Sequence, residues 1–168
     1  TDDGRVGATK IVLLISDGEQ SKELAAPGMT ATQTAINAAA LIKGDGVTVF
    51  AWGFGEGASL ATLQEIATDP SEVILTKEIS ELNSYLAQLE AAVCIPPPPT
   101  CAQPIDVVLV LDESGSMKKP GPDGSMEGPG GLKAFAKQLV SQYSLGVDAA
   151  RFSVVSFAAD ATTRVEMS

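Results

Sequence analysis

The residues best suited to chemistry are one carboxylate and two hydroxyls at the end of a long apolar run. Asp112, Ser114 and Ser116 follow directly on residues 105–111, and Gly115 allows a tight turn between the two serines. Hard oxygen ligands of this kind suit Mg²⁺, Mn²⁺ or Ca²⁺. Because these ligands carry little negative charge, the ion stays electrophilic and keeps a coordination position for an acidic group. The pattern predicts a cation-dependent binding site; the alternative is an ordinary surface turn of small polar residues.

The residue types in the chain exclude several other kinds of site. The 168 residues include no histidine, which excludes His-based zinc sites, Ser-His-Asp triads and Cys-His dyads. Since no nucleophile–base pair can be assembled, we predict that the protein is not an enzyme. The glycines at 53, 55 and 57 lack the Gly-x-Gly-x-x-Gly spacing of a dinucleotide loop, and the sequence contains no P-loop.

The overall charge and hydrophobicity limit the class of partner. The formal net charge is −10, and a surface this acidic repels phosphate backbones, so no nucleic acid partner is expected. Hydrophobic residues make up 45% and charged residues 19%, which is typical of a globular domain. No apolar run approaches the roughly 20 residues of a membrane-spanning helix. The first residues resemble neither an initiator segment nor a signal peptide, so we expect a processed or excerpted piece of a longer chain.

Strands and helices are expected to alternate along most of the chain. Helices are predicted at 30–43, 59–67, 78–92 and 132–143, and strands at 10–16, 47–52, 72–76, 105–111, 151–157 and 162–167. The segment 118–131 is rich in glycine and proline and is expected to be a loop. This alternation predicts an α/β fold: a Rossmann-like, mostly parallel sheet with helices on both faces and one antiparallel edge strand.

Two segments of the sequence resemble the von Willebrand factor type A (vWA) domain family. Residues 105–117 look like its first strand and ion-binding loop, and residues 11–18, ending in Ser-Asp-Gly, look like its fourth strand and following loop. The resemblance implies a metal-ion-dependent adhesion site (MIDAS) in which Asp112, Ser114 and Ser116 are ion ligands. It also implies that Asp17 helps to bind the ion, commonly through water. The alternative role for Asp17 is that of a turn or N-cap residue.

The pieces of the family's fold stand in reversed order in this chain. Residues 1–93 resemble the C-terminal half of a vWA domain, residues 94–104 form a Cys/Pro-rich linker, and residues 105–168 resemble the N-terminal half. The chain is therefore either two half-domains of a tandem array or a circularly permuted single domain. For the permuted assembly we predict the spatial strand order 162–167, 151–157, 105–111, 10–16, 47–52, 72–76. The ion would then lie at the carboxyl ends of the central strands, at the topological switch point.

Two further features of the resemblance concern the completeness and the setting of the site. The family's threonine ligand lies between the early and late halves, and that part has no counterpart here, so the site is expected to be incomplete or to be completed by another copy. Cys94 and Cys101 bracket a proline run, where burial is unexpected, and we interpret them as a disulfide formed in an oxidising compartment. The alternative is a pair of buried free thiols.

The favoured function is divalent-cation-dependent protein binding in adhesion or extracellular matrix assembly. The cofactor would be Mg²⁺, Mn²⁺ or Ca²⁺, and the partner another protein that supplies an acidic side chain, or further copies of the same chain. The expected location is extracellular or at the cell surface. One alternative is a structural repeat of an extracellular filament or wall layer whose ion site is incomplete or unoccupied. Another is an intracellular vWA domain of a chelatase or an ATPase-linked complex, which the cysteines and the proline linker disfavour.

Overall fold

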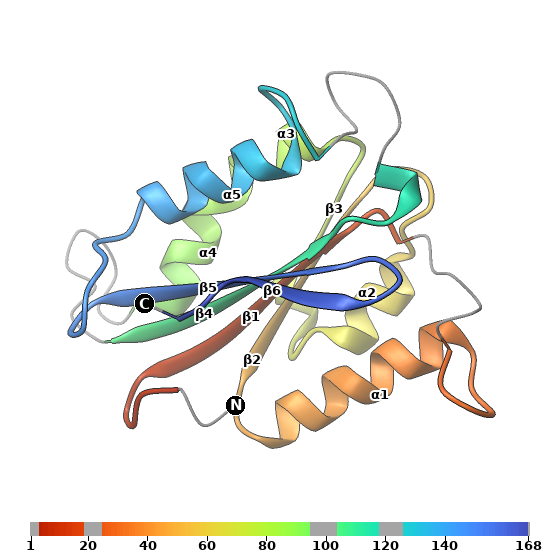
Figure 1. The fold of residues 1–168 in the computed structure, drawn as a ribbon, viewed down its shortest axis with the longest axis horizontal. Coiled ribbons are helices and arrows are strands. Elements are labelled where there is room, and N and C mark those ends of the chain that lie inside the picture. Colours follow the sequence, from red (N-terminus) through yellow and green to blue (C-terminus); the bar gives the residue numbers. More distant parts are fainter. Residues whose placement is uncertain (1–3, 19–24, 95–103, 118–125, 168) are drawn as a thin grey trace.

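A six-stranded sheet runs through the whole molecule (Figure 1). The computed structural model describes residues 4–18, 25–94, 104–117 and 126–167. The strands follow the spatial order β3-β2-β1-β4-β5-β6, which confirms the predicted order. Their bounds are β1 Thr9–Ser16, β2 Thr48–Phe54, β3 Val73–Thr76, β4 Ile105–Asp112, β5 Ala150–Phe157 and β6 Ala161–Val165.

The sheet is parallel except at one edge, as the sequence predicted. β1 pairs in parallel with β2 on one side and with β4 on the other, and β4 pairs in parallel with β5. β6 returns antiparallel along β5. Because β1 and β4 are neighbours at the centre, the segments before and after the proline run contribute to one continuous sheet.

Helices cover both faces of the sheet. On one face lie α3 (Ile79–Leu82), α4 (Leu86–Val93) and α5 (Leu132–Ser141), and on the other lie α1 (Ala31–Gly44) and α2 (Leu60–Ile66) (Figure 1). The core accordingly has two parts. The larger one includes Trp52, whose ring meets that of Phe135 edge-on with 5.9 Å between the centroids. None of the helices in the described part of the chain is both long and apolar enough to cross a lipid bilayer.

Local signals set several helix boundaries. Thr30 forms a capping box with Gln33 at the start of α1, and the Ser59 side chain accepts a hydrogen bond from the backbone of Thr62 at the start of α2. The prediction of a single helix over 78–92 is wrong, because a 3₁₀ turn at Asn83–Tyr85 divides this segment into α3 and α4. Asn83 and Ser84 have lower helix propensity than their leucine and alanine neighbours, which weakens the helix at this point.

A buried ion-pair cluster lies at the amino ends of β4 and β5. Asp106 is 3% exposed and accepts hydrogen bonds from the backbone and side chain of Arg5 and from the side chain of Arg151. Arg5 also donates to the backbone oxygens of Ile105, Val147 and Ala149. The cluster therefore fastens the segment before β1 to the two strands that follow the proline run.

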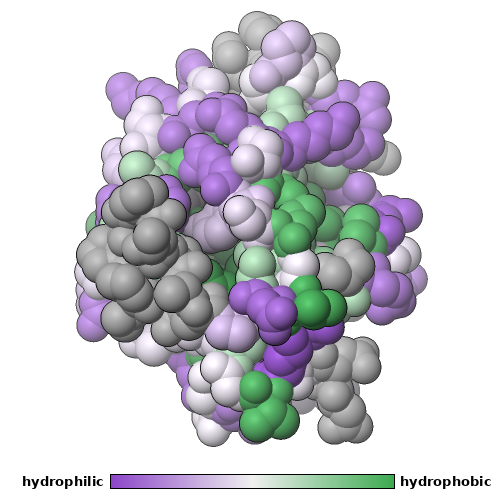
Figure 2. Space-filling view, turned by 90° about the vertical axis from the view of Figure 1, so that its left-hand side faces the viewer, coloured by the Kyte–Doolittle hydropathy of each residue, from purple (hydrophilic) through white to green (hydrophobic). Residues whose placement is uncertain are grey.

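The surface on the left-hand side of Figure 1 faces the viewer in Figure 2. Hydrophilic side chains cover most of this surface, and apolar ones lie between them (Figure 2). Val6, Leu145 and Val147 are among the exposed large hydrophobic residues of the described chain. Single exposed apolar residues are ordinary on protein surfaces, so they define no site by themselves.

Cys94 ends α4 and is only 1% exposed, so the expectation that it would not be buried is wrong. Cys94 belongs to the larger core, together with Val93, the last residue of α4. None of the cysteines in the described residues is a free thiol. Cys101 and the proline run lie outside the described residues, and the pairing of Cys94 with Cys101 stays a prediction.

Candidate functional site

The carboxylate of Asp112 lies at the carboxyl end of β4, beside the end of β1. Ile15 is in register with Leu111, so the next residues, Ser16 and Asp112, are neighbours across the two strands. The hydroxyl of Ser16 donates a hydrogen bond of 2.6 Å to Oδ2 of Asp112. Asp112 is completely buried. The sheet register therefore fixes where this carboxylate lies and which of its oxygens is engaged.

The loop after β4 folds back onto the same carboxylate. The backbone N–H of Ser114 donates a hydrogen bond of 2.8 Å to Oδ1 of Asp112. A 3₁₀ turn follows at Gly115–Met117, and the backbone N–H of Met117 donates to the carbonyl of Ser114. The Met117 side chain is 1% exposed and anchors the turn in the larger core. Gly115 is exposed, as a residue at the outside of a tight turn should be.

The two serine hydroxyls of the loop lie side by side. Oγ of Ser114 and Oγ of Ser116 are 2.8 Å apart, with either one as the donor. The structure thus brings the predicted ligands Asp112, Ser114 and Ser116 together in one loop, with Ser114 bonded to both of the others.

Asp17 stands at the end of β1, one residue beyond Ser16, and is 8% exposed. Gly18 follows with φ of +78° and donates its N–H to the Ser16 hydroxyl at 3.0 Å. A Cβ added at Gly18 would lie 2.5 Å from the Cα of Ala58, so only glycine fits this turn. The turn places Asp17 at the same edge of the sheet as Asp112, on the neighbouring central strand.

Ser16 is the residue of this site that the ligand prediction missed. It was recognised only as part of a Ser-Asp-Gly motif, yet its hydroxyl links β1, the turn at Gly18 and Asp112. A signal was present, since adjacent parallel strands bring the residues at their carboxyl ends together. The exact partner depends on register, which the motifs alone do not set.

The donor set fits a small hard cation. The described residues contain no group of three or more His, Cys, Asp or Glu side chains that could hold a metal. What they offer is one buried carboxylate, Asp112, the hydroxyls of Ser114 and Ser116, and the neighbouring Asp17. Mg²⁺ and similar ions are commonly held through one or two carboxylates while keeping water or partner oxygens in other positions. Such a set suits these ions better than a soft transition metal.

A charged pair lies beside the loop on the α5 side of the sheet. Arg164, on β6, donates to Oε2 of Glu113 at 2.6 Å and to the hydroxyl of Ser156 at 2.7 Å. The hydrogen bonds from Arg164 and Ser156 hold the pKa of Glu113 below its ordinary value. The residue between Asp112 and Ser114 is therefore fastened to the antiparallel edge of the sheet.

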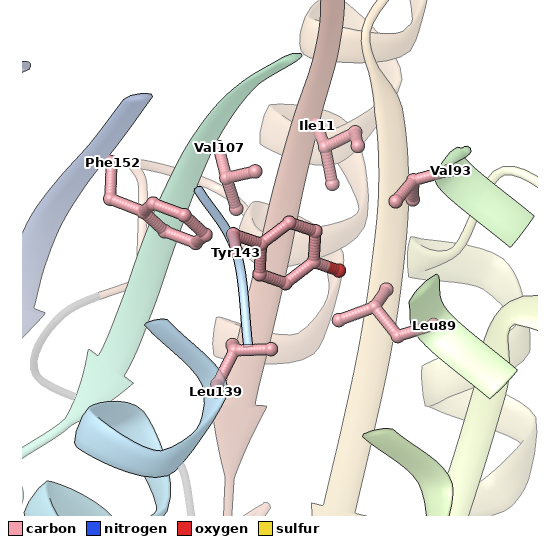
Figure 3. Close-up of a pocket in the computed structure, with 7 residues that line it drawn as sticks. All are labelled: Ile11, Leu89, Val93, Val107, Leu139, Tyr143 and Phe152. Carbon is pink, nitrogen blue, oxygen red and sulfur yellow. The ribbon is translucent and has the colours of Figure 1, made fainter. Parts of the chain in front are cut away.

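An apolar crevice lies between α4, α5 and the sheet, away from the loop (Figure 3). Its lining residues are Ile11, Leu89, Val93, Val107, Leu139, Tyr143 and Phe152, and their side chains pack too closely to leave room for a water-sized molecule. Burial, together with the charge of Glu90, raises the pKa of the Tyr143 hydroxyl well above its ordinary value. The crevice offers packing surface and no set of groups for acid–base chemistry.

The fold and the loop define a class: an α/β domain with an Asp-x-Ser-x-Ser turn at the carboxyl end of a central strand. The sequence pattern of the von Willebrand factor type A domain matches residues 1–89 and 106–168. The chain belongs to this family. The family relationship agrees with the prediction that the protein is not an enzyme.

The relatives by sequence are chains of collagen. The collagen alpha-5(VI) chain of Homo sapiens is 28% identical over 153 residues, which is 91% of this chain and 5% of the relative. The collagen alpha-5(VI) chain of Mus musculus is 30% identical over 114 residues, or 68% of this chain and 4% of the relative. The chain thus spans about a twentieth of the collagen chains that it matches.

Solved structures of proximal thread matrix protein 1 from the mussel byssus are also similar. One crystal form is 28% identical with a TM-score of 0.40, and it covers 96% of this chain and 38% of that protein. A structure of the same protein with a zinc-occupied MIDAS motif is 30% identical with a TM-score of 0.39, covering 93% of this chain and 36% of that one.

Proposed function

We propose that this chain is a protein-binding module that depends on a divalent cation held at a MIDAS-type site. The observation that carries the proposal is the arrangement of Asp112, completely buried, with Ser16 on one carboxylate oxygen and the Ser114 backbone on the other. Burying a carboxylate is costly unless it is well paired, and a cation is a common reason to keep one. The candidate ligands are Asp112, Ser114 and Ser116, with Asp17 acting through water.

The ion would serve as a link to an acidic side chain of another protein. Asp112 is the only ligand of the set that would bind directly through a full negative charge, so a bound Mg²⁺, Mn²⁺ or Ca²⁺ would keep a net positive charge. A carboxylate from a partner is the natural ligand for a remaining position. Further copies of the same chain are a second source of such a carboxylate, because the chain carries 21 Asp and Glu residues.

We propose an extracellular or cell-surface location. The relatives are a collagen chain and a thread matrix protein, and their names support a role in matrix assembly. The proposed disulfide between Cys94 and Cys101 would require an oxidising compartment. A thiol titration under denaturing conditions tests this directly, because two free thiols would contradict it.

We also propose that residues 1–93 and 105–168 are the late and early halves of the vWA fold, joined by residues 94–104. The similarity to human collagen alpha-5(VI) extends over 153 residues, 91% of this chain, inside a far longer chain. A tandem array and a circularly permuted domain both give this order. A second Ser-Asp-Gly strand following residue 168 in the parent gene would establish the array, and its absence would establish the permutation.

Titration calorimetry with Mg²⁺ and with Mn²⁺ tests the ion site. We expect saturable binding to the unaltered chain and none to Asp112→Ala, with Ser116→Ala weakened by about tenfold, the loss of one neutral ligand. Asp148→Ala is the matched control, because Asp148 is an exposed aspartate near the amino end of β5. Circular dichroism checks that each variant is folded. No heat at millimolar ion with the unaltered chain would overturn the proposal.

The second candidate is a structural repeat of an extracellular filament or wall layer. The similarity to a collagen chain and to a thread matrix protein favours it, since both names describe fibrous material. In this case the ion site is incomplete or unoccupied. Failure to bind any ion, together with concentration-dependent assembly in ultracentrifugation, would support this candidate over the first.

A further inference from the structure

A cavity of about 390 Å³ opens beside the Asp112 loop, on the α5 side of the sheet. Leu111 and Val154 form an apolar floor, and Met126 adds to it from the segment that leads into α5. The remaining lining residues are polar: Glu113, Lys133, Ser156 and Arg164. Glu113 belongs both to this cavity and to the loop of the candidate ligands, so the cavity adjoins the proposed ion site.

The lining of this cavity carries more positive than negative charge, although the chain as a whole is strongly acidic. Lys133 and Arg164 are two cations against the one carboxylate of Glu113 among the lining residues, while a second carboxylate, that of Glu127, pairs with Lys133 from outside the lining. The first turn of α5 contains no acidic residue, and Gly131 at its N-cap provides no side-chain cap. The positive end of the helix therefore adds to the two cations. In a chain of net charge −10, two neighbouring half-exposed cations beside a helix N-terminus offer a local site for a negative group.

Both cations can bind a further carboxylate. The side chain of Lys133 is 51% exposed, and its partner Glu127 is 78% exposed. Ion pairs this open to water are weak and exchange readily. Arg164 is 52% exposed and directs its Nε at Ser156 and one terminal nitrogen at Glu113. A guanidinium has five N–H groups, so Arg164 keeps donors for a ligand.

We propose that the cavity is a second subsite of the partner interface. It binds a second acidic side chain of the partner, adjacent to the acidic side chain that coordinates the ion. The partner is then an acidic protein segment with two carboxylates, one for the cation and one for Lys133 and Arg164. The aliphatic stem of a glutamate suits the apolar floor, while its carboxylate reaches the charged rim. The inference rests on the proposed function and adds the chemical class of the partner.

The test uses a hexaglutamate peptide as probe, titrated into the whole chain at a fixed, saturating Mn²⁺ concentration. Lys133→Met should weaken hexaglutamate binding by about tenfold, the loss of one charge-assisted contact. Lys137→Met is the matched control, since Lys137 is an exposed lysine on the same helix that does not line the cavity. This control removes the same charge and should change the affinity by less than about twofold. The double variant Lys133→Met with Arg164→Gln should bind more weakly still.

A separate Mn²⁺ titration without peptide distinguishes failure of the subsite from failure of the ion site. If Mn²⁺ binds but hexaglutamate does not, the second subsite is overturned while the proposed function stands. Equal losses in Lys133→Met and Lys137→Met would also overturn it, because the effect would then come from overall charge. If Mn²⁺ fails to bind, the proposed function is wrong. A loss of hexaglutamate affinity in Lys133→Met but not in Lys137→Met would still identify the cavity as an anion site.

Discussion

The Ser16 hydroxyl donates a 2.6 Å hydrogen bond to Asp112, joining residues that are 96 positions apart in the sequence. It connects the end of β1 to the end of β4, the two central strands of the sheet. Ser16 in turn accepts the N–H of Gly18, so the same hydroxyl also fixes the Ser-Asp-Gly turn. The two motifs of the candidate site are therefore coupled through one side chain, which is not itself among the proposed ion ligands.

Replacement of Ser16 by alanine should destabilise the fold by about 1–2 kcal/mol. The reason is that Oδ2 of Asp112 would lose its donor while the carboxylate stays buried. Urea unfolding measures the loss. Ser141→Ala is the control, because its hydroxyl makes only a local bond to the carbonyl of Gln138 at an exposed helix end. That change should cost less than about 0.5 kcal/mol. Equal effects of the two substitutions would show that the Ser16–Asp112 bond contributes nothing specific.

Replacement of Gly18 by alanine should be more damaging than the same change at Gly46. Both glycines have nearly the same positive φ, +78° and +77°, so the backbone strain is matched, at about 1 kcal/mol for each. A Cβ at Gly18 would also lie within 2.5 Å of Ala58, whereas a Cβ at Gly46 would have nothing within 4 Å. We expect a total loss of about 2–4 kcal/mol for Gly18→Ala. Thermal unfolding of the two variants, compared side by side, checks the difference.

Most of the fold was predictable because its signals are local. Apolar runs that end at Asp, Gly or Ser predict the three central strands at 10–16, 47–52 and 105–111, and strand–helix alternation predicts a parallel sheet. Asp112, Ser114 and Ser116 come together because they lie within one turn. Contacts that depend on register or on distant segments were not predictable. They include the bond from Ser16 to Asp112, the pairing of Arg164 with Glu113, and the burial of Cys94 by the core.

The stability of the protein should depend on pH through Asp106. Burial by itself would raise the pKa of Asp106, but hydrogen bonds from Arg5 and Arg151 outweigh burial and hold the pKa below its ordinary value. A carboxyl group with a lowered pKa in the folded state contributes stability above its unfolded pKa, which is about 4. That contribution is lost as the pH falls through the folded pKa.

Asp106→Asn should therefore cost about 3 kcal/mol at pH 7, since two arginines would lose their buried partner. The difference from the unaltered chain should start to shrink as the pH falls below about 4, where Asp106 is protonated in the unfolded chain, and should shrink fully only below the lower folded pKa, where Asp106 is protonated in both states. Urea unfolding across this pH range measures it. Asp148→Asn, at an exposed position, is the matched control and should change the free energy of unfolding by less than about 0.5 kcal/mol. A constant gap between Asp106→Asn and the unaltered chain at all pH values would contradict this account.

The segments on either side of the proline run should not fold independently. β1 lies between β2 and β4, so removal of residues 105–168 would expose one side of a central strand. Trp52, the only tryptophan, reports on this directly because it is 1% exposed and its ring packs against Phe135 of α5. Residues 1–93 alone should show tryptophan emission shifted to the red, as expected for an indole exposed to water. Addition of residues 105–168 should reverse the shift.

The intact chain provides the reference, with blue-shifted emission and one cooperative unfolding transition. Phe135→Leu in the intact chain is the control for the ring contact alone: it removes the aromatic partner but keeps the burial of Trp52, so its emission should stay near the reference. If residues 1–93 alone gave blue-shifted emission and unfolded cooperatively, the two segments would be independent units. In that case Arg5 and Asp106, which link the segments at the amino ends of the strands, would contribute little to stability. We expect the opposite, because the larger core draws residues from both segments and neither can bury its apolar face alone.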